Sequence, residues 1–318
     1  MRLCVVIPML NEAANLGALY RRLKETIAKL DCDGRIIFVD DGSTDESARL
    51  IADLAAADGH VVGICLSRNF GHEAASTAGL DEAAALGADA AVLMDADLQD
   101  PPEVIEQLVA RWKEGNQIVY AVRRKRHGEG FIKRVCAYLF YRIHNWLSDV
   151  KIPTDTGDFR LMDAKVLEAV RLCREQDRFV RGLVAWTGFQ SAAVEYDRPP
   201  RGAGKSKYGF WKLLFLSFDA AVGFSIAPLR LATAMGFVVT FLSMAMALII
   251  IIQKLAVGIK IEGYALLASG LFFLGGVQML LLGILGEYIG RIYRQAQGRP
   301  LYLVSRRIGS PPTQPPTP

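Results

Sequence analysis

Two carboxylates one residue apart, Asp95 and Asp97, directly follow a short apolar run at residues 90–94. Like charges this close repel each other unless a cation lies beside them. Hard divalent cations such as Mg²⁺ bind carboxylate oxygens together with substrate phosphates. The apolar run predicts a buried strand, and ligands of open α/β sheets bind at the carboxyl ends of strands. The two acids therefore indicate a cation site, with solvated acids before a helix as the alternative.

A helix is expected directly after these acids. Asp100, the prolines at 101 and 102, and Glu103 form a typical helix start, with an N-cap, prolines in the first turn and a capping-box glutamate. Residues 43–46 form a second capping box, which predicts a helix to about Ala57. The local order is therefore strand, acidic turn and helix.

Strand and helix patterns alternate along the first half of the chain. Each predicted strand is a short apolar run, and helical spacing of apolar residues follows it. This alternation predicts an α/β fold with a mostly parallel, Rossmann-like sheet and helices on both faces. The predicted strands cover residues 3–7, 35–39, 61–66, 90–94 and 118–122.

Polar side chains follow four of these strands. The carboxyl ends of parallel strands lie at one edge of a sheet, so these side chains are expected to line one pocket. A pocket of acids and amides needs a metal ion to hold phosphates. The polar sets are Asn11 and Glu12, Asp40 and Asp41, Asn69 and His72, and Asp95 and Asp97.

Composition and missing motifs exclude several classes of protein. The sequence contains neither G-x-G-x-x-G after the first strand nor a P-loop, so a dinucleotide or P-loop site is not supported. A net charge of +4 without basic-aromatic interleaving argues against nucleic acid as a partner. Five scattered cysteines fit reduced thiols in the cytosol, not a disulfide framework or a zinc site. Met1 leads into a strand too closely for a signal peptide.

The middle of the chain mixes amphipathic and polar segments. Residues 131–147 predict an amphipathic helix, which would pack on the domain or lie at a membrane surface. A polar loop at 154–163 precedes helices at 166–172 and 179–187 and a strand at 192–196. The glycine-rich basic segment at 198–209 is a linker or a lid that closes cations over a diphosphate.

The last third of the chain is strongly apolar. Residues 231–253 and 263–286 carry no charge, and at ~1.5 Å per residue each would cross a hydrocarbon core of ~30 Å. Two buried soluble helices are the alternative. Flanking arginines and lysines place both ends in the cytoplasm by the positive-inside rule, as expected of a multi-pass inner-membrane protein. Glycines in the second span fit helix–helix contact and leave a homo-oligomer, such as a tetramer, open.

These segments divide the chain into four expected parts. The cytoplasmic catalytic domain is expected at 1–209, and an interfacial amphipathic segment at 210–228. Two transmembrane helices follow within 229–290. A cytoplasmic basic tail, disordered from about Ser310, covers 291–318.

Five motifs in fixed order resemble the family 2 glycosyltransferases of the GT-A fold. More narrowly, the chain resembles the polyprenyl-phosphate glycosyltransferases, relatives of dolichol-phosphate mannose synthase and of bactoprenol glucosyltransferases. The resemblance covers nearly the whole chain, including the paired apolar segments. One departure is Met9-Leu10, where many relatives carry an aromatic residue before the asparagine. The motifs lie at residues 7–12, 39–45, 68–72, 95–102 and 157–161.

The resemblance implies a role for each matching residue. Asp95 and Asp97 would bind Mg²⁺ or Mn²⁺ and, through it, the diphosphate of a nucleotide sugar. The acceptor phosphate would meet Arg123, Arg134 and Arg160, and arginine forks do match phosphate oxygens. The base and ribose would lie on Pro8, Asn11, Glu12 and Asp41, supported by Asp40. Gln99 would lie near the donor sugar, and Arg201, Lys205 and Ser206 would belong to the lid.

The resemblance also implies a mechanism. A lipid monophosphate with a second pKa of about 6 is already ionised at pH 7, so no strong base is required. We expect a single in-line displacement with inversion at the anomeric carbon, driven by positioning and electrostatics. His72 is a candidate base, although a histidine packing under the pocket is preferred. Asp158 is a second candidate base, with a structural or acceptor-positioning role as its alternative.

Three functions remain to be weighed. Transfer of glucose from UDP-glucose to undecaprenyl phosphate is preferred, with mannose, N-acetylglucosamine and aminoarabinose open as other sugars. A processive polysaccharide synthase is disfavoured because the sequence has no Gln-x-x-Arg-Trp motif and too few apolar segments. A catalytically silent membrane scaffold is disfavoured because the acidic motifs are intact.

Overall fold

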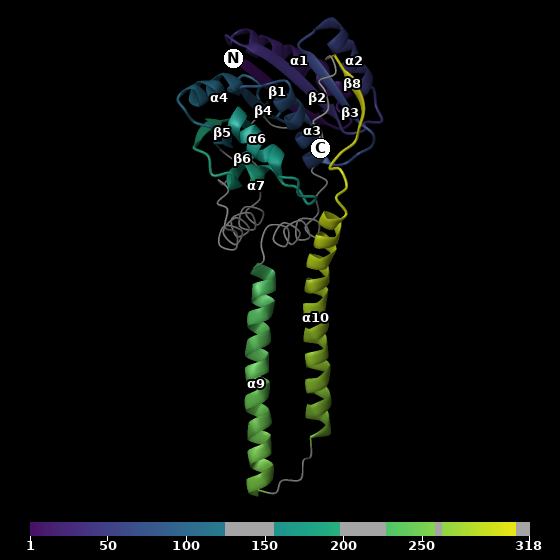
Figure 1. Cartoon of the computed structure of the whole chain (residues 1–318), viewed down its shortest axis with the longest axis vertical. Coiled ribbons are helices and arrows are strands. Elements are labelled where there is room, and N and C mark those ends of the chain that lie inside the picture. Colours follow the sequence, from purple (N-terminus) through teal and green to yellow (C-terminus); the bar gives the residue numbers. More distant parts are fainter. Residues whose placement is uncertain (125–155, 198–226, 258–262, 310–318) are drawn as a thin grey trace. The chain divides into compact units, whose positions relative to one another are not determined.

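The computed structural model describes residues 1–124, 156–197, 227–257 and 263–309 (Figure 1). The chain divides into two compact units. The first contains the α/β domain together with the C-terminal residues from Arg299, and the second contains two long helices. Each unit is described by itself below.

In the described part of the first unit, eight strands form one mixed sheet, in the order β7-β5-β6-β4-β1-β2-β3-β8. The four central strands β4, β1, β2 and β3 run parallel, as the βα alternation predicts. Strand β6 is antiparallel to both β4 and β5, and β8 is antiparallel to β3. The strands are β1 (Arg2–Met9), β2 (Asp33–Asp40), β3 (Val61–Leu66), β4 (Ala90–Leu93), β5 (Ile118–Arg123), β6 (Thr156–Asp163), β7 (Ser191–Tyr196) and β8 (Val304–Ile308).

Helices cover both faces of the sheet (Figure 1). Successive side chains of β1 point to opposite faces, so Leu3, Val5 and Ile7 join one core while Cys4 and Val6 join the other. Helices α1, α2 and α4 close the first core, and α3, α6 and α7 close the second. The helices are α1 (Ala13–Ala28), α2 (Ser47–Ala57), α3 (His72–Ala85), α4 (Val104–Lys113), α6 (Ala164–Leu172) and α7 (Val180–Trp186).

Neither predicted capping box forms. Helix α2 begins at Ser47 and α4 at Val104, and neither has a side-chain cap. The carboxylate of Asp45 instead accepts the backbone N–H groups of Ala13 and Ser47. Asp100 accepts the hydroxyl of Tyr196 from the distant strand β7, at 2.6 Å. The contacts with Ala13 and Tyr196 are long-range, whereas Asp45 also accepts the local N–H of Ser47 at the start of α2.

Two strands differ from the sequence expectation. Residues 156–163, expected within a polar loop, form the buried strand β6 between β4 and β5. Strand β8 lies within the expected basic tail and pairs with the sheet edge at β3. We call residues 299–309 the C-terminal strap. Its Ser305 hydroxyl donates to the backbone of Cys65, and its Arg307 pairs with Glu82 of α3 at 3.3 Å.

The second unit contains α9 (Ala227–Val257) and α10 (Tyr264–Ala296). Within the described residues, one segment, Phe273–Ala296, is long and apolar enough to cross a membrane by length and composition. A shorter apolar segment lies at Gly236–Met246. The expected pair of membrane spans is therefore not confirmed as a pair, and the multi-pass arrangement stays a prediction. The expected interfacial segment lies almost wholly outside the described residues.

Candidate functional site

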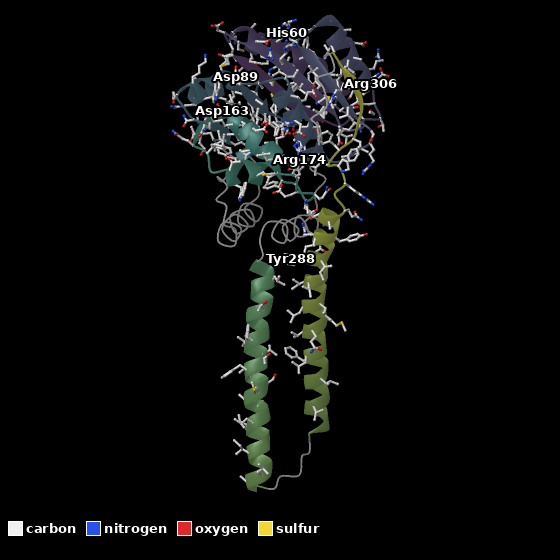
Figure 2. All side chains as sticks on the ribbon, in the orientation of Figure 1. His60, Asp89, Asp163, Arg174, Tyr288 and Arg306 are labelled. Atoms are coloured by element: carbon white, nitrogen blue, oxygen red, sulfur yellow. The ribbon has the colours of Figure 1, made fainter. Side chains whose placement is uncertain are left out.

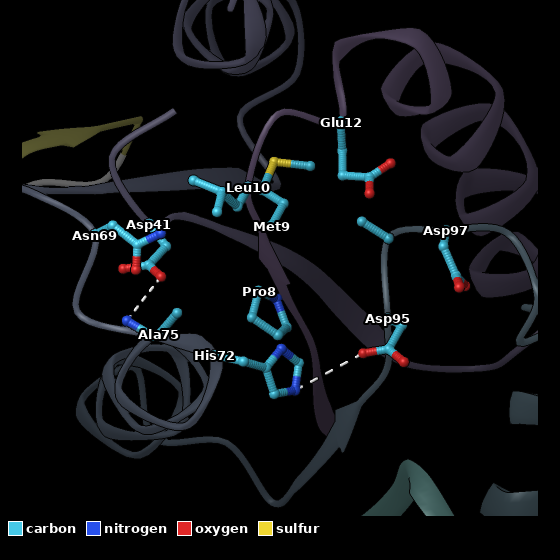
Figure 3. Close-up of a pocket in the computed structure, with 12 residues that line it drawn as sticks. Pro8, Met9, Leu10, Glu12, Asp41, Asn69, His72, Ala75, Asp95 and Asp97 are labelled. Carbon is cyan, nitrogen blue, oxygen red and sulfur yellow. Dashed lines mark hydrogen bonds and ion pairs between the residues drawn. The ribbon is translucent and has the colours of Figure 1, made fainter. Parts of the chain in front are cut away.

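A pocket of about 280 Å³ opens at the carboxyl ends of β1, β2, β3 and β4 (Figure 3). The turns after these strands and the first turn of α3 supply its walls, as expected from the polar residues after the strands. Of the residues expected to bind the donor or a metal, five line the pocket. They are Pro8, Glu12, Asp41, Asp95 and Asp97.

Asn11 and Asp40 lie beside this pocket and shape its turns. Asn11 has a left-handed backbone (φ 57°), which asparagine tolerates better than most residues. Its side-chain oxygen accepts the N–H of Thr44 at 2.8 Å, and its own N–H donates to Ser43. The carboxylate of Asp40 accepts the N–H of Ser43 at 3.1 Å. These bonds join the turn after β1 to the turn after β2. Both residues therefore support the pocket without lining it.

Asp41 holds the pocket wall that the turn after β3 forms. Its two oxygens accept the backbone N–H groups of Phe70 and Gly71 at 2.8 and 2.9 Å. Gly71 has a φ of 99°, a conformation that favours glycine, so the turn after β3 depends on it. Burial raises the pKa of Asp41, although both hydrogen bonds oppose the shift. Each carboxylate oxygen can accept more than one hydrogen bond, so Asp41 can also accept an N–H of a base.

The carboxylate of Asp95, which follows β4, lies near other carboxylates whose negative charge is not fully offset. Burial raises the pKa of Asp95 to about 6, and the carboxylates of Asp100 and Asp158 add to the shift. Asp97 accepts the N–H of Gln99 at 3.0 Å and lines the same pocket wall as Asp95. A divalent cation would relieve this crowding, and both side chains offer the oxygen ligands that Mg²⁺ and Mn²⁺ prefer. The residues present therefore fit a metal ion.

A second set of ligand atoms shares Asp95. The ligand atoms of His72, Asp95 and Asp158 lie within 4.8 Å of one another. Asp158, however, is already paired with Arg181 at 3.0 Å and with Arg160 at 3.6 Å. A cation bound there would have to compete with two guanidinium groups. We therefore favour the pair of Asp95 and Asp97 as metal ligands.

Neither candidate base is poised to take up a proton, because one is too weakly basic and the other is already protonated. Burial alone would raise the pKa of Asp158, but His72 and the two arginines hold it well below its usual range. Hydrogen bonding to Asp158, opposed by burial and aided by Asp95, raises the pKa of His72 to about 9. At neutral pH the carboxylate is ionised and the imidazole protonated. His72 is also 43% exposed and lines the pocket, so the expectation that it packs underneath is wrong.

Comparison with known proteins identifies the family. Residues 4–171 match the family model described as glycosyl transferase family 2. The chain belongs to this family. Residues 227–292, which hold most of the two long helices of this glycosyltransferase, match a second model, described as the GtrB C-terminal hairpin.

Full-length relatives extend this assignment. A glycosyltransferase of Synechocystis sp. described as uncharacterised is 44% identical over 95% of this chain and 94% of its own length. The SfII prophage-derived bactoprenol glucosyl transferase of Shigella flexneri is 40% identical over 96% of this chain and 98% of its own. Among solved structures, glucosyl-3-phosphoglycerate synthase of Mycobacterium tuberculosis has a TM-score of 0.45 at 20% identity, over 70% of this chain and 78% of that chain. That last likeness is too distant to carry an argument about substrate or metal.

The arginines expected at the acceptor differ in accessibility. Arg160 of the glycosyltransferase is 0% exposed and donates to the backbone carbonyls of Gly157 and Asp158. Its expected contact with an acceptor phosphate is therefore not available in this structure. Arg123 is only half-buried at the end of β5, and its guanidinium lies against Gly157. A Cβ at Gly157 would lie 2.9 Å from Arg123 Nη2, so the glycine permits this close approach.

The remaining predicted residues divide into one buried residue and four that are not described. Gln99 is buried beside Asp97 and does not line the pocket. The others belong to segments outside the described residues, so their predicted roles are untested. They are Arg134, Arg201, Lys205 and Ser206.

Sequence reasoning missed two residues of the site. Arg181 of α7 pairs with Asp158, and its Nη1 donates to the carbonyl of Thr156 at 3.1 Å. Tyr196 of β7 contacts Asp100, which the sequence analysis treated as a helix cap. The helical pattern around Arg181 and the strand pattern around Tyr196 are ordinary. Only the three-dimensional pairing of β6, β5 and β7 brings these residues to the acids of β4.

Proposed function

We propose that this glycosyltransferase transfers glucose from UDP-glucose to undecaprenyl phosphate, with inversion, at the cytoplasmic face of the inner membrane. One observation carries the proposal. A pocket at the carboxyl edge of the sheet is lined by two acids that fit a divalent metal, and the half-buried Arg123 ends strand β5, two strands from β4. The name of the Shigella flexneri relative, a bactoprenol glucosyl transferase, supports a polyprenyl acceptor and glucose as the donor sugar.

The donor half of the site would hold a UDP-sugar. Pro8, Glu12 and Asp41 line the part of the pocket proposed for base and ribose. Asp95 and Asp97 would hold Mg²⁺ or Mn²⁺, which when bound offsets the charge that develops on the leaving diphosphate. Gln99, held against Asp97, would support the region of the donor sugar.

The acceptor half requires no general base. The phosphate of the lipid has a second pKa of about 6 and is ionised at neutral pH. This agrees with the protonated His72 and the clamped Asp158, neither of which is poised to remove a proton. The residues would instead position the phosphate oxygen in line with the anomeric carbon, which supports a single displacement. Arg123 is proposed as the phosphate contact.

Membrane attachment is proposed for the second unit. The match of residues 227–292 to a C-terminal hairpin and the apolar segment Phe273–Ala296 support it. Many large apolar side chains of both helices are exposed, including Phe237, Phe241 and Phe273. We propose that 231–253 and 263–286 cross the membrane, which would return the chain to the cytoplasm. A lipid acceptor then presents only its head group to the catalytic domain.

A donor panel tests this function. The full chain in detergent is incubated with undecaprenyl phosphate, Mg²⁺ and one nucleotide sugar at a time. The panel contains donors of glucose, N-acetylglucosamine, mannose and aminoarabinose. We expect the highest turnover with UDP-glucose and a product with one sugar per lipid. A polymeric product would indicate a processive synthase. No turnover and no UDP binding by calorimetry would indicate a scaffold.

A further inference from the structure

A buried hydrogen bond joins two distant parts of the chain beside the acids of β4. The hydroxyl of Tyr196 donates to Oδ1 of Asp100 at 2.6 Å. Asp100 is 0% exposed and Tyr196 is 5% exposed. A buried carboxylate that accepts a hydroxyl is costly to leave unpaired, so this contact is a fixed part of the structure. It ties the phenol oxygen to Asp100, three residues after Asp97.

The tyrosine ring is held by the sheet and by an aromatic contact. Strand β7 pairs in parallel with β5, and the register sets Tyr196 opposite Arg123. The ring of Tyr196 meets that of Phe159 edge-to-face, with centroids 5.8 Å apart and planes at 81°. Phe159 is itself 0% exposed. Two constraints therefore fix where the hydroxyl lies.

Arg123 lies beside the same hydroxyl, since it is the register partner of Tyr196. Burial disfavours its charge, but the hydrogen bond to Tyr196 and the carboxylates of Asp100 and Asp95 raise the pKa of Arg123 above its ordinary value. A guanidinium is only a donor, so the chain of donation runs from Arg123 to Tyr196 to Asp100. Among the described residues, the buried Nε of Arg123 has no hydrogen-bond partner. The guanidinium is thus charged and held beside the tyrosine hydroxyl at the end of β5.

We propose that Tyr196, anchored by Asp100, is a positioning residue that aims Arg123 at the phosphate of the acceptor lipid. This inference rests on the proposed function, in which Arg123 contacts that phosphate. Oriented N–H donors match phosphate oxygens only when the plane of the guanidinium is fixed, because the contact is directional. Tyr196 itself touches no substrate. Without its hydroxyl, Arg123 would keep its charge and lose its orientation.

The test uses two tyrosines with the same local chemistry. Tyr196→Phe removes the hydroxyl and keeps the ring against Phe159. Tyr302→Phe is the matched control, because the hydroxyl of Tyr302 donates to Asp81 at 2.7 Å, beside Arg174 and away from the pocket. Steady-state kinetics use the full chain in detergent with UDP-glucose and undecaprenyl phosphate. For Tyr196→Phe we expect the KM for undecaprenyl phosphate to rise about tenfold, while the KM for UDP-glucose stays within twofold. Tyr302→Phe should change neither constant.

A double-mutant cycle separates positioning from general support of the fold. In an Arg123→Lys background, Tyr196→Phe should have little further effect on the KM for the acceptor. Lysine has no planar guanidinium for the tyrosine to orient. Asp100→Asn keeps the side-chain size and removes the charged anchor, so it should raise the same KM. It serves as the second variant if Tyr196→Phe is unstable.

Three results would overturn the inference. Tyr196→Phe could match Tyr302→Phe in acceptor KM, its effect could add fully to that of Arg123→Lys, or it could weaken UDP binding instead. Turnover by the wild-type chain separates these failures from failure of the proposed function. No lipid-linked sugar from the wild type with any donor overturns the proposed function and this inference with it. Normal wild-type turnover with any of the three results overturns the positioning role alone.

Discussion

Two clusters of aspartate, tyrosine and arginine lie in the first unit, which contains the α/β domain. The site cluster contains Asp100, Tyr196 and Arg123, beside the acids that follow β4. The strap cluster joins Tyr302 of the C-terminal strap to Asp81 of α3 and to Arg174, which is labelled in Figure 2. Both tyrosine hydroxyls donate to a carboxylate, at 2.6 and 2.7 Å. The residue types are therefore the same and the arrangement is not.

The arginine makes the difference. In the strap cluster both terminal nitrogens of Arg174 donate to the two oxygens of Asp81, at 2.8 and 3.0 Å. That bidentate pair satisfies the two charges within the cluster, and the Tyr302 hydroxyl joins the strap to α3. In the site cluster the tyrosine stands between acid and arginine, and among the described residues no carboxylate forms an ion pair with the guanidinium. The same three residue types thus serve stability in one place and, as proposed, substrate positioning in the other.

The largest effect is expected at the metal ligands. Asp97→Asn keeps the acceptor oxygen for the Gln99 N–H and removes the charge that would hold the metal. We expect kcat to fall on the order of 10²–10³-fold, as for other losses of transition-state charge stabilisation. Asp89→Asn, at the opposite end of β4, is the control and should retain normal kcat. Initial rates at saturating substrates and Mg²⁺ measure both. Full activity of Asp97→Asn with a chelator present would contradict the metal assignment.

The two arginines provide the next contrast. Arg123→Lys keeps the charge and loses the planar fork, so we expect the KM for undecaprenyl phosphate to rise about 10–100-fold. Arg174→Lys makes the same change in the strap cluster and should leave that KM unchanged. Acceptor titrations at saturating UDP-glucose provide the measurement. Equal effects of the two substitutions would remove the functional distinction between the clusters.

A substitution in the strap cluster is expected to change the stability of the fold instead of the kinetic constants. Tyr302→Phe leaves the charged Asp81 without its hydroxyl donor, and we expect a loss of about 1–2 kcal/mol in the free energy of unfolding of the first unit. Thermal unfolding in detergent should show a lower Tm, while kcat and both KM values stay within twofold. A loss of activity without a change in Tm would assign the strap a role in catalysis.

The smallest effect concerns His72 and pH. Its pKa is about 9 in the fold and about 6.5 when unfolded, so its charge stabilises the fold fully below pH 6.5. That contribution is lost as pH rises through 9. Because the side chain is 43% exposed, solvent screening limits it to about 1 kcal/mol. In metal-free buffer, the stability difference between wild type and His72→Gln should shrink from pH 6 to 9.5. A difference that grows with pH would contradict the ion pairs of His72.

Local patterns were sufficient to predict the parallel half of the sheet and the pocket at its edge. Each apolar run ends in polar residues, and the rule that parallel strands share one carboxyl edge brings Glu12, Asp41 and Asp95 together. The same local logic failed at the helix starts. Ser43 and Asp100 fit capping boxes by spacing, yet both accept hydrogen bonds from residues distant in sequence.

The antiparallel additions to the sheet were beyond prediction from one sequence. Strand β6 carries Asp158 and Arg160 in a segment with polar residues, and only burial between β4 and β5 makes it a strand. Strand β8 is exposed at its three central residues and gains its partner from an edge 240 residues earlier in the chain. Tyr196 enters the site because β7 pairs with β5, and Arg181 because it pairs with Asp158 of β6, so no local spacing could indicate them.

Transfer of label to lipid tests the central claim most directly. The full chain in detergent receives radiolabelled UDP-glucose, undecaprenyl phosphate and Mg²⁺, and the organic phase is counted after extraction. We predict that label enters the organic phase with the wild type and falls on the order of 100-fold with a chelator or with Asp97→Asn. Labelling that is unchanged by both, or absent from the wild type although UDP binds, would contradict the account.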